Sequence, residues 1–128
     1  AGPLRILDLG AGTGSNLRAL APGLPTPQIW TLADNDPGLT GGVRAPDGVE
    51  AHAIEVDLAS ALPDFAGYDL VTAAAFLDLV SGDWTARLAE ALGRARVPFL
   101  AVLSVDGTAA FDPAHPLDPV VREAVNAH

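Results

Sequence analysis

The 128-residue sequence predicts an α/β domain built on a doubly wound, mostly parallel β-sheet. Short apolar runs alternate along the chain with segments of helical spacing, which is the order of strands joined by crossover connections. Hydrophobic residues make up 49% of the chain and charged residues 18%, which supports one packed core and excludes intrinsic disorder.

The N-terminal half contains three strand candidates. Leu4 to Leu9 is an apolar run that ends at a glycine, and we expect a buried strand there. Leucines at helical spacing predict a helix from about Gly14 to Ala21. Gln28 to Ala33 is rich in β-forming residues, and Val49 to Val56 is the third candidate. Residues 37 to 48 between them hold four Gly and two Pro, so any helix there would be short.

The C-terminal half continues the alternation, with an Asp before each helix and turn residues between the apolar runs. The expected elements are a strand from Tyr68 to Ala74, a helix from Trp84 to Leu92 capped by Asp83 and ended by Gly93, a strand from Val97 to Val105, a hairpin turn at Asp106-Gly107 into Thr108 to Phe111, and a helix from Val120 to about Asn126 opened by Asp118-Pro119.

Charge and composition exclude several classes of protein. Seven basic residues, all Arg, stand against 16 acidic ones, so a phosphate backbone has no basic stripe to bind and nucleic acid is not expected as a partner. No apolar stretch is long enough to span a membrane, and no secretory signal precedes the first strand. Without Cys there is no disulfide or thiolate site, and we expect a cytoplasmic protein without a metal. The missing initiator Met suggests an excerpt of a longer chain.

The residues just after each strand carry the candidate chemistry, because ligands of such sheets bind beyond the carboxyl ends of the strands. After the first strand, Gly10, Gly12 and Gly14 allow a sharp turn and a close approach of the backbone to a ligand. Ser15 occupies the last position of the dinucleotide-binding pattern G-x-G-x-x-G, so that pattern fails. Glycine turns between a strand and a helix also occur for structural reasons alone.

Two acids follow the next two strands. Asp34 can accept hydrogen bonds from both hydroxyls of a ribose, although it can also form a turn that feeds Pro37. Asp36 fits the turn better than a ligand. Asp57 can accept from an exocyclic amine while the next backbone N–H donates to a ring nitrogen, which together would recognise adenine. An Asp that simply begins a loop is the alternative.

Four segments resemble class I S-adenosylmethionine-dependent methyltransferases in their order and spacing: Ile6 to Gly14, Leu32 to Pro37, Val56 to Leu58 and Tyr68 to Val71. The resemblance covers roughly residues 4 to 80. It implies a Rossmann-like sheet of strand order 3-2-1-4-5 and S-adenosylmethionine as cofactor. Residues 1–128 would be a single, partial methyltransferase domain, since strands six and seven of the family are not visible.

The resemblance also implies which residues contact the methionine half of the cofactor. They are Asp8 and the loop residues Gly10, Ala11, Gly12, Thr13 and Gly14. Ala73 and Ala74, at the end of the fourth strand, would lie against the methionine amine and the reacting methyl group.

For the adenosine half, the resemblance implies four contacts. Asp34 would hold both ribose hydroxyls, and Asn35 would cover a face of the adenine. Asp57 would accept from the adenine amine, and the backbone N–H of Leu58 would donate to a ring nitrogen.

The sequence predicts the acceptor and any catalytic residue less directly. Methyl transfer is an in-line displacement that rests on alignment, so an acid or base is optional. Asp78 is a candidate to face the acceptor, or else an exposed or capping acid. Trp84 could line an acceptor pocket, but core packing is the commoner role; His52 and His115 read as structural or surface residues.

A small-molecule methyl acceptor is expected. The segment after the fourth strand lacks the Asn/Asp-Pro-Pro-aromatic motif of adenine-N6 and glutamine methyltransferases, and no Cys is available to attack cytosine C5. Two alternatives stay open. One is a non-catalytic nucleoside-binding module, and the other is an NAD-dependent dehydrogenase, which Ser15 and the absence of Lys disfavour.

Overall fold

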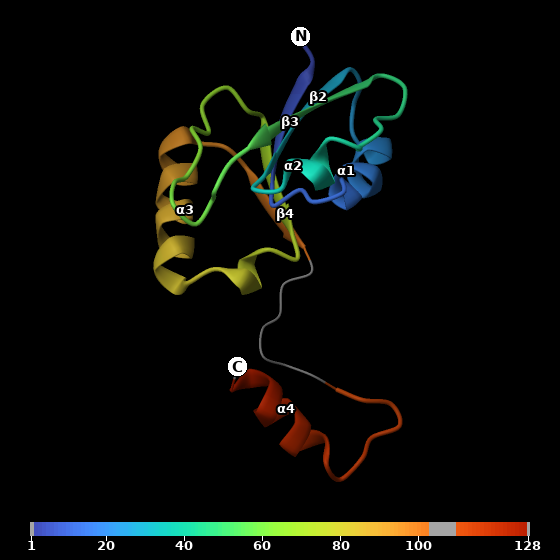
Figure 1. Cartoon of the computed structure of the whole chain (residues 1–128), viewed down its shortest axis with the longest axis vertical. Coiled ribbons are helices and arrows are strands. Elements are labelled where there is room, and N and C mark those ends of the chain that lie inside the picture. Colours follow the sequence, from blue (N-terminus) through green and yellow to red (C-terminus); the bar gives the residue numbers. More distant parts are fainter. Residues whose placement is uncertain (1, 103–109, 128) are drawn as a thin grey trace.

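A computed structural model describes residues 2–102 and 110–127, and within them one parallel five-stranded sheet organises the chain. The strands are β1 (Leu4–Leu9), β2 (Gln28–Asp34), β3 (Val49–Glu55), β4 (Leu70–Ala74) and β5 (Phe99–Val102). Every strand pair is parallel, and the order across the sheet is β3-β2-β1-β4-β5 (Figure 1). The predicted fold class and strand order are therefore confirmed.

The helices and 3-10 turns of the described residues are α1 (Ser15–Leu20), η1 (Ala21–Gly23), α2 (Pro37–Thr40), η2 (Leu77–Leu79), α3 (Gly82–Ala95) and α4 (Asp118–Asn126). The chain moves from β1 to β2 in one direction and from β4 to β5 in the other. Right-handed crossovers therefore place α1 and α3 on opposite faces of the sheet, as Figure 1 shows. The strand order reverses between β1 and β4, which is where ligands bind in such sheets.

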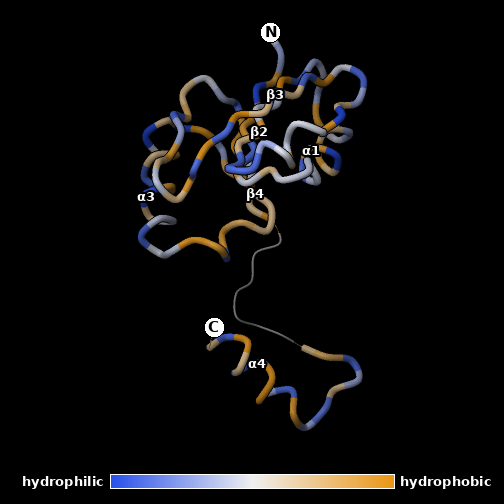
Figure 2. Tube along the Cα trace, viewed as in Figure 1, coloured by the Kyte–Doolittle hydropathy of each residue, from blue (hydrophilic) through white to orange (hydrophobic). Residues whose placement is uncertain are grey.

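Side chains from alternate strand residues pack in two hydrophobic cores, one on each face of the sheet. The core on the α3 face includes Leu7, Leu9, Val71, Ala73, Trp84, Leu88 and Leu92. The core on the α1 face includes Ile6, Leu17, Ala21, Trp30 and Leu32. In Figure 2 hydrophobic residues are visible along the strands, and also on α4 and in the segment before α3. Because β1 is buried on both faces, its side chains fix the position of the loop that follows it.

The start and end of α3 differ from the prediction. Its N-cap is Ser81, whose Oγ accepts a hydrogen bond from the backbone N–H of Trp84 at 3.1 Å, so Asp83 lies inside the first turn. The helix continues through Gly93 to Ala95 and ends at Arg96, which has φ 55°. A glycine lowers helix stability by only about 1 kcal/mol, and the buried α3 face outweighs that cost.

The chain after β4 agrees with the prediction only in part. β5 begins at Phe99, two residues later than predicted, and residues 103–109, with the predicted end of that strand and the turn at Asp106-Gly107, lie outside the described residues. Phe111, which was predicted in a strand, is not in one. The final helix begins at Asp118, with Pro119 in its first turn as expected. Asp118 does not cap the helix: its Oδ2 accepts from the backbone N–H of His115 at 2.8 Å.

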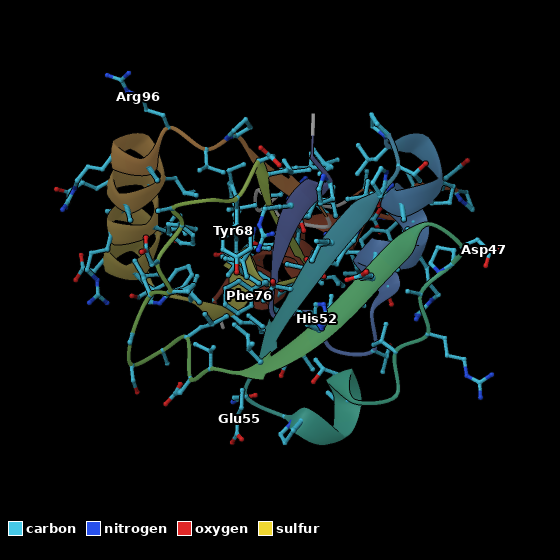
Figure 3. All side chains as sticks on the ribbon, turned by 90° about the horizontal axis from the view of Figure 1, so that it is seen from above. Asp47, His52, Glu55, Tyr68, Phe76 and Arg96 are labelled. Carbon is cyan, nitrogen blue, oxygen red and sulfur yellow. The ribbon has the colours of Figure 1, made fainter. Side chains whose placement is uncertain are left out.

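His52 and His115 have the structural or surface roles expected of them. His115 Nδ1 accepts from the backbone N–H of Leu117 at 3.1 Å, within the turn before α4. His52 is exposed on β3 (Figure 3). Its Nε2 lies 3.5 Å from Oε2 of Glu50. In the part of the chain that the structure describes, no helix has the length and apolarity needed to cross a membrane.

Candidate functional site

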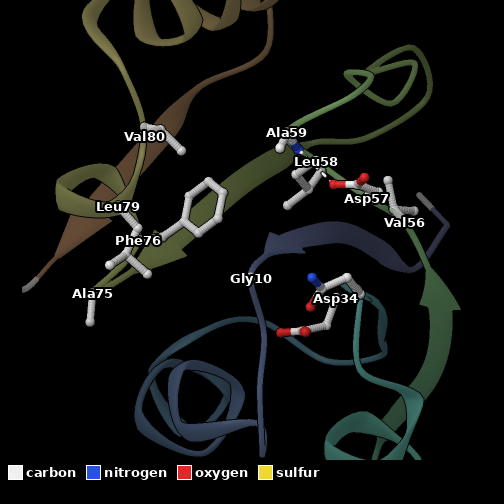
Figure 4. A pocket seen from close by; sticks show the side chains of 11 residues that line it. Gly10, Asp34, Val56, Asp57, Leu58, Ala59, Ala75, Phe76, Leu79 and Val80 are labelled. Carbon is white, nitrogen blue, oxygen red and sulfur yellow. Dashed lines mark hydrogen bonds between the residues drawn. The ribbon is translucent and has the colours of Figure 1, made fainter.

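A cavity of about 300 Å³ opens at the carboxyl ends of the central strands (Figure 4). Its lining comes from the segments that follow β1, β2, β3 and β4: Gly10, Asp34, Asn35, Val56, Asp57, Leu58, Ala59, Ala75, Phe76, Leu79 and Val80. The structure thus brings Gly10 and the four residues expected around an adenosine into one cavity.

The loop after β1 needs its glycines. Gly10, Gly12 and Gly14 have φ angles of +64°, +53° and +83°, in the left-handed region that side chains disfavour. A Cβ on Gly10 would lie 2.6 Å from Cδ2 of Phe76, whereas a Cβ on Gly12 would meet no atom within 4 Å. The loop therefore packs closely against Phe76 at one end and leaves open space at Gly12.

Asp34 ends β2 and is oriented by backbone donors. Its Oδ2 accepts from the N–H of Gly12 at 2.8 Å, and its Oδ1 accepts from the N–H of Asp36 at 3.0 Å. Each oxygen retains a further lone pair for a ligand. Asp34 therefore forms the turn of the alternative interpretation, and it also lines the cavity. Asp36, as expected, is a turn residue: its side chain caps α2 through the N–H of Gly38 at 2.9 Å.

Asp57 follows β3, begins the next loop and also lines the cavity. Its Oδ1 accepts from the N–H of Ala59 at 3.2 Å, and its Oδ2 accepts from Oγ of Ser60 at 2.7 Å. These contacts form the loop start that was the alternative reading. The carboxylate remains exposed at the cavity wall, beside buried Leu58.

Asp8 lies below this cavity and does not line it. Its side chain is 1% exposed, and Oδ1 accepts from Thr72 Oγ at 2.7 Å and from Asn16 Nδ2 at 3.1 Å. Burial raises the pKa of Asp8 above its ordinary value, and the charge of Asp34 adds to the rise; the hydrogen bonds from Asn16 and Thr72 act in the opposite direction.

The segment after β4 contributes residues that the sequence analysis missed. Ala73 is 1% exposed and packs in the α3-face core, and neither it nor Ala74 lines the cavity; Ala75 and Phe76 do. Ala75 has φ 49°, and its N–H donates to Val102 at 3.0 Å. The chain therefore turns at Ala75. In the sequence, a bulky residue, Phe76, directly after three alanines indicates that this segment could line a pocket.

Trp84 of α3 contacts residues of two cavity walls but does not line the cavity itself. It is 4% exposed, and its Nε1 donates to the carbonyl of Leu58 at 2.6 Å. Its ring meets Phe76 edge to face, with centroids 5.4 Å apart and planes at 73°. Trp84 is thus a core residue, the commoner of the two roles considered for it, and it supports the segments after both β3 and β4.

Ala11, Thr13 and Gly14 do not line the cavity, and neither does Gly12. Asp78 is exposed on η2, directly before the lining residues Leu79 and Val80. In the described ranges, no group of three or more His, Asp or Glu side chains is arranged to hold a metal ion.

Comparisons with known proteins point to one class of fold. No protein-family model matches the chain, and no curated protein sequence matches it. A structure of an S-adenosylmethionine-dependent methyltransferase from Mesorhizobium loti superposes with a TM-score of 0.54 and 28% identity, covering 77% of this chain and 45% of that one. The plantazolicin methyltransferase BpumL, in complex with SAH, superposes with a TM-score of 0.53 and 23% identity, covering 72% of this chain and 34% of that one.

This chain is therefore structurally similar to S-adenosylmethionine-dependent methyltransferases, with the five-stranded parallel core of that fold. It spans less than half the length of either structure.

Proposed function

We propose that this chain binds S-adenosylmethionine and serves as the cofactor-binding part of a methyltransferase for a small-molecule acceptor. One observation carries the proposal: Asp34 after β2, Asp57 after β3 and Gly10 after β1 line the same cavity. A nucleoside needs acceptors for its ribose hydroxyls and its adenine amine, and these two carboxylates supply them from adjacent strand ends.

The residues present fit this cofactor. Gly12 has open space where a side chain would stand, which leaves room for a ligand beside the backbone. Asp8 has a buried oxygen, Oδ2, that lacks a hydrogen-bond partner within the described residues. In the proposed complex Asp34 binds the ribose, Asn35 covers the adenine, and Asp57 with the Leu58 N–H recognises the adenine edge.

The charge of the cavity favours a cationic ligand over an anionic one. Of the described residues that line it, the charged ones are Asp34 and Asp57. A sulfonium cation is attracted by such a site, whereas the pyrophosphate of a nicotinamide dinucleotide is repelled. This electrostatic preference supports the methyltransferase over the dehydrogenase alternative.

When bound, S-adenosylmethionine supplies a methyl group on a sulfonium whose leaving group is a neutral thioether. The contribution of this chain is alignment: the glycine loop and the carboxylates fix the adenosyl group, so that an acceptor can approach in line with the carbon–sulfur bond. Removal of a proton from the acceptor depends on its chemistry. Asp78, exposed beside the lining residue Leu79, is the candidate base on this chain.

The β4 side of the cavity supports an apolar, small acceptor. Ala75, Phe76, Leu79 and Val80 line that side, opposite the carboxylates of β2 and β3 (Figure 4). An apolar wall provides burial for an uncharged molecule but no counter-charge for an anion.

Calorimetry with S-adenosylmethionine, S-adenosylhomocysteine and NAD tests the proposal. We expect binding of the two sulfur nucleosides and none of NAD. The matched variants are Asp57→Ala and Asp64→Ala: each carboxylate accepts from a backbone N–H two residues on, but Asp57 alone of the two lines the cavity. Asp57→Ala should weaken binding about tenfold while Asp64→Ala leaves it unchanged. Binding of NAD alone would contradict the proposal.

A further inference from the structure

A buried polar cluster closes the base of the glycine loop. It consists of Asp8 of β1, Asn16 of α1 and Thr72 of β4, and we call it the Asp8 cluster. Its members are 1%, 5% and 0% exposed. Asp8 and Thr72 are direct partners in the β1–β4 register, and Asn16 reaches Asp8 from the helix that follows the loop. The cluster therefore joins both ends of the glycine loop to the strand across the switch point.

The two oxygens of Asp8 have unequal surroundings. Oδ1 accepts both hydrogen bonds, from Thr72 Oγ at 2.7 Å and from Asn16 Nδ2 at 3.1 Å. Oδ2 is also buried, yet it has no hydrogen-bond partner among the described residues. A buried carboxylate oxygen without a donor is costly, and native proteins rarely keep one without a functional reason. A donor that arrives with a ligand would remove that cost.

Resting on the proposed function, we infer that Asn16 and Thr72 are positioning residues: their hydrogen bonds to Oδ1 favour the ionised form of Asp8, so that Oδ2 receives a donor from bound S-adenosylmethionine and the affinity rises as Asp8 ionises. The geometry supports different roles for the two oxygens of Asp8. The two neutral donors occupy Oδ1 and leave Oδ2 free, and both are held by elements that meet at the loop.

The electrostatic surroundings make Asp8 sensitive to pH. Burial raises its pKa, the negative charge of Asp34 on β2 raises it further, and the donors Asn16 and Thr72 lower it. From α1, the guanidinium of Arg18 donates to Thr13 O at 2.6 Å and to Ser15 Oγ at 3.2 Å, so it is engaged with the outer side of the loop. A bound cation favours the ionised carboxylate, so binding releases a proton whenever Asp8 is protonated beforehand.

The test measures the affinity of the whole chain for S-adenosylmethionine by calorimetry between pH 5 and pH 7. The α-amino group of the ligand stays mostly protonated in this range, since an ordinary α-amino pKa is about 7.7. We expect the affinity of the wild type to rise with pH as Asp8 ionises. Asp8→Asn should bind more weakly and lose this rise, and it should release fewer protons when titrated in buffers of different ionisation enthalpy.

The positioning residues are tested by conservative pairs. Thr72→Val keeps the shape of the side chain but removes the donor, so the pH profile should move upward by about one unit. Thr72→Ser restores a hydroxyl and should restore the profile. Asn16→Ala removes the second donor and should move the profile in the same direction, which keeps the test open if one Thr72 variant does not fold. Circular dichroism and the Tm identify the folded variants.

Each outcome separates the two proposals. If the wild type and Asp8→Asn share one pH profile, or if the Thr72→Val and Thr72→Ser midpoints coincide, the role of the Asp8 cluster is refuted while the proposed function stands. If the wild type binds no S-adenosylmethionine at any pH in the range, the proposed function itself fails.

Discussion

Replacing Asp34 by alanine removes the acceptor on which the proposed ribose contact depends. In the structure, Oδ2 and Oδ1 of Asp34 accept from the backbone N–H groups of Gly12 and Asp36, which fixes the carboxylate at the cavity wall. Asparagine is a poor substitute here, because its NH₂ group would face one of these N–H donors. Alanine removes both oxygens and avoids that conflict.

The expected loss follows from the strength of hydrogen bonds to a charged group. One such hydrogen bond contributes about 1.5–3 kcal/mol to binding. When the carboxylate is removed, both proposed bonds from the ribose hydroxyls are lost, but water then hydrogen-bonds to these hydroxyls and offsets part of the loss. We therefore assign about 1.5–3 kcal/mol to the whole carboxylate, so its loss should raise the Kd for S-adenosylmethionine roughly 10- to 150-fold.

The assay is calorimetry on folded protein with S-adenosylmethionine and with an analogue that lacks the ribose 2′-hydroxyl. The wild type should bind the analogue more weakly, and Asp34→Ala should discriminate much less between the two ligands. Asp36→Ala is the control, because Asp36 caps α2 and does not line the cavity. An unchanged Kd in folded Asp34→Ala protein would refute the assignment of Asp34.

Three further predictions follow. Gly12→Val should abolish binding of S-adenosylmethionine, because a β-branched residue at φ +53° is strained and its side chain would fill the open space beside the loop. Arg94 is exposed, and the control variant Arg94→Ala should bind the cofactor normally in the same titration. Trp84→Phe removes the donor to the Leu58 carbonyl, so the free energy of unfolding should fall by about 1 kcal/mol, which lowers the Tm. The affinity for S-adenosylmethionine should fall as well, and an unchanged Tm would contradict this prediction. Because the pKa of Asp8 is raised in the folded state, Asp8 of the unfolded state loses its proton at lower pH than Asp8 of the folded state. In denaturant unfolding from pH 4 to 7, the free energy of unfolding of the wild type should therefore fall relative to that of Asp8→Asn. If the two free energies changed in parallel with pH, this prediction would be wrong.

The sheet and the strand-end residues could be predicted because they depend on local patterns. Apolar runs separated by crossover segments determine a parallel sheet, and its geometry brings the ends of neighbouring strands to one edge. Gly10, Asp34 and Asp57 therefore meet in one cavity as expected. No interaction between distant residues had to be known in advance.

The remaining features depend on side-chain direction and on contacts between distant segments. Ala73 points into the core, and the turn at Ala75 brings Phe76 to the cavity. The bulky Phe76 after three alanines marks the segment, but three identical residues do not show at which of them the chain turns. The hydrogen bond from Thr72 to Asp8 spans 64 positions and follows from strand register alone. The N-cap of α3 was misplaced because Ser81 and Asp83 are both good caps, and the backbone path decides between them.

A crystal structure of this chain with S-adenosylhomocysteine tests the central claim most directly. We predict electron density for the adenosyl group in the cavity, with the ribose hydroxyls within hydrogen-bond distance of Asp34 and the adenine amine beside Asp57. Density for the nucleoside elsewhere on the chain, with no ligand at Asp34 and Asp57, would contradict this prediction.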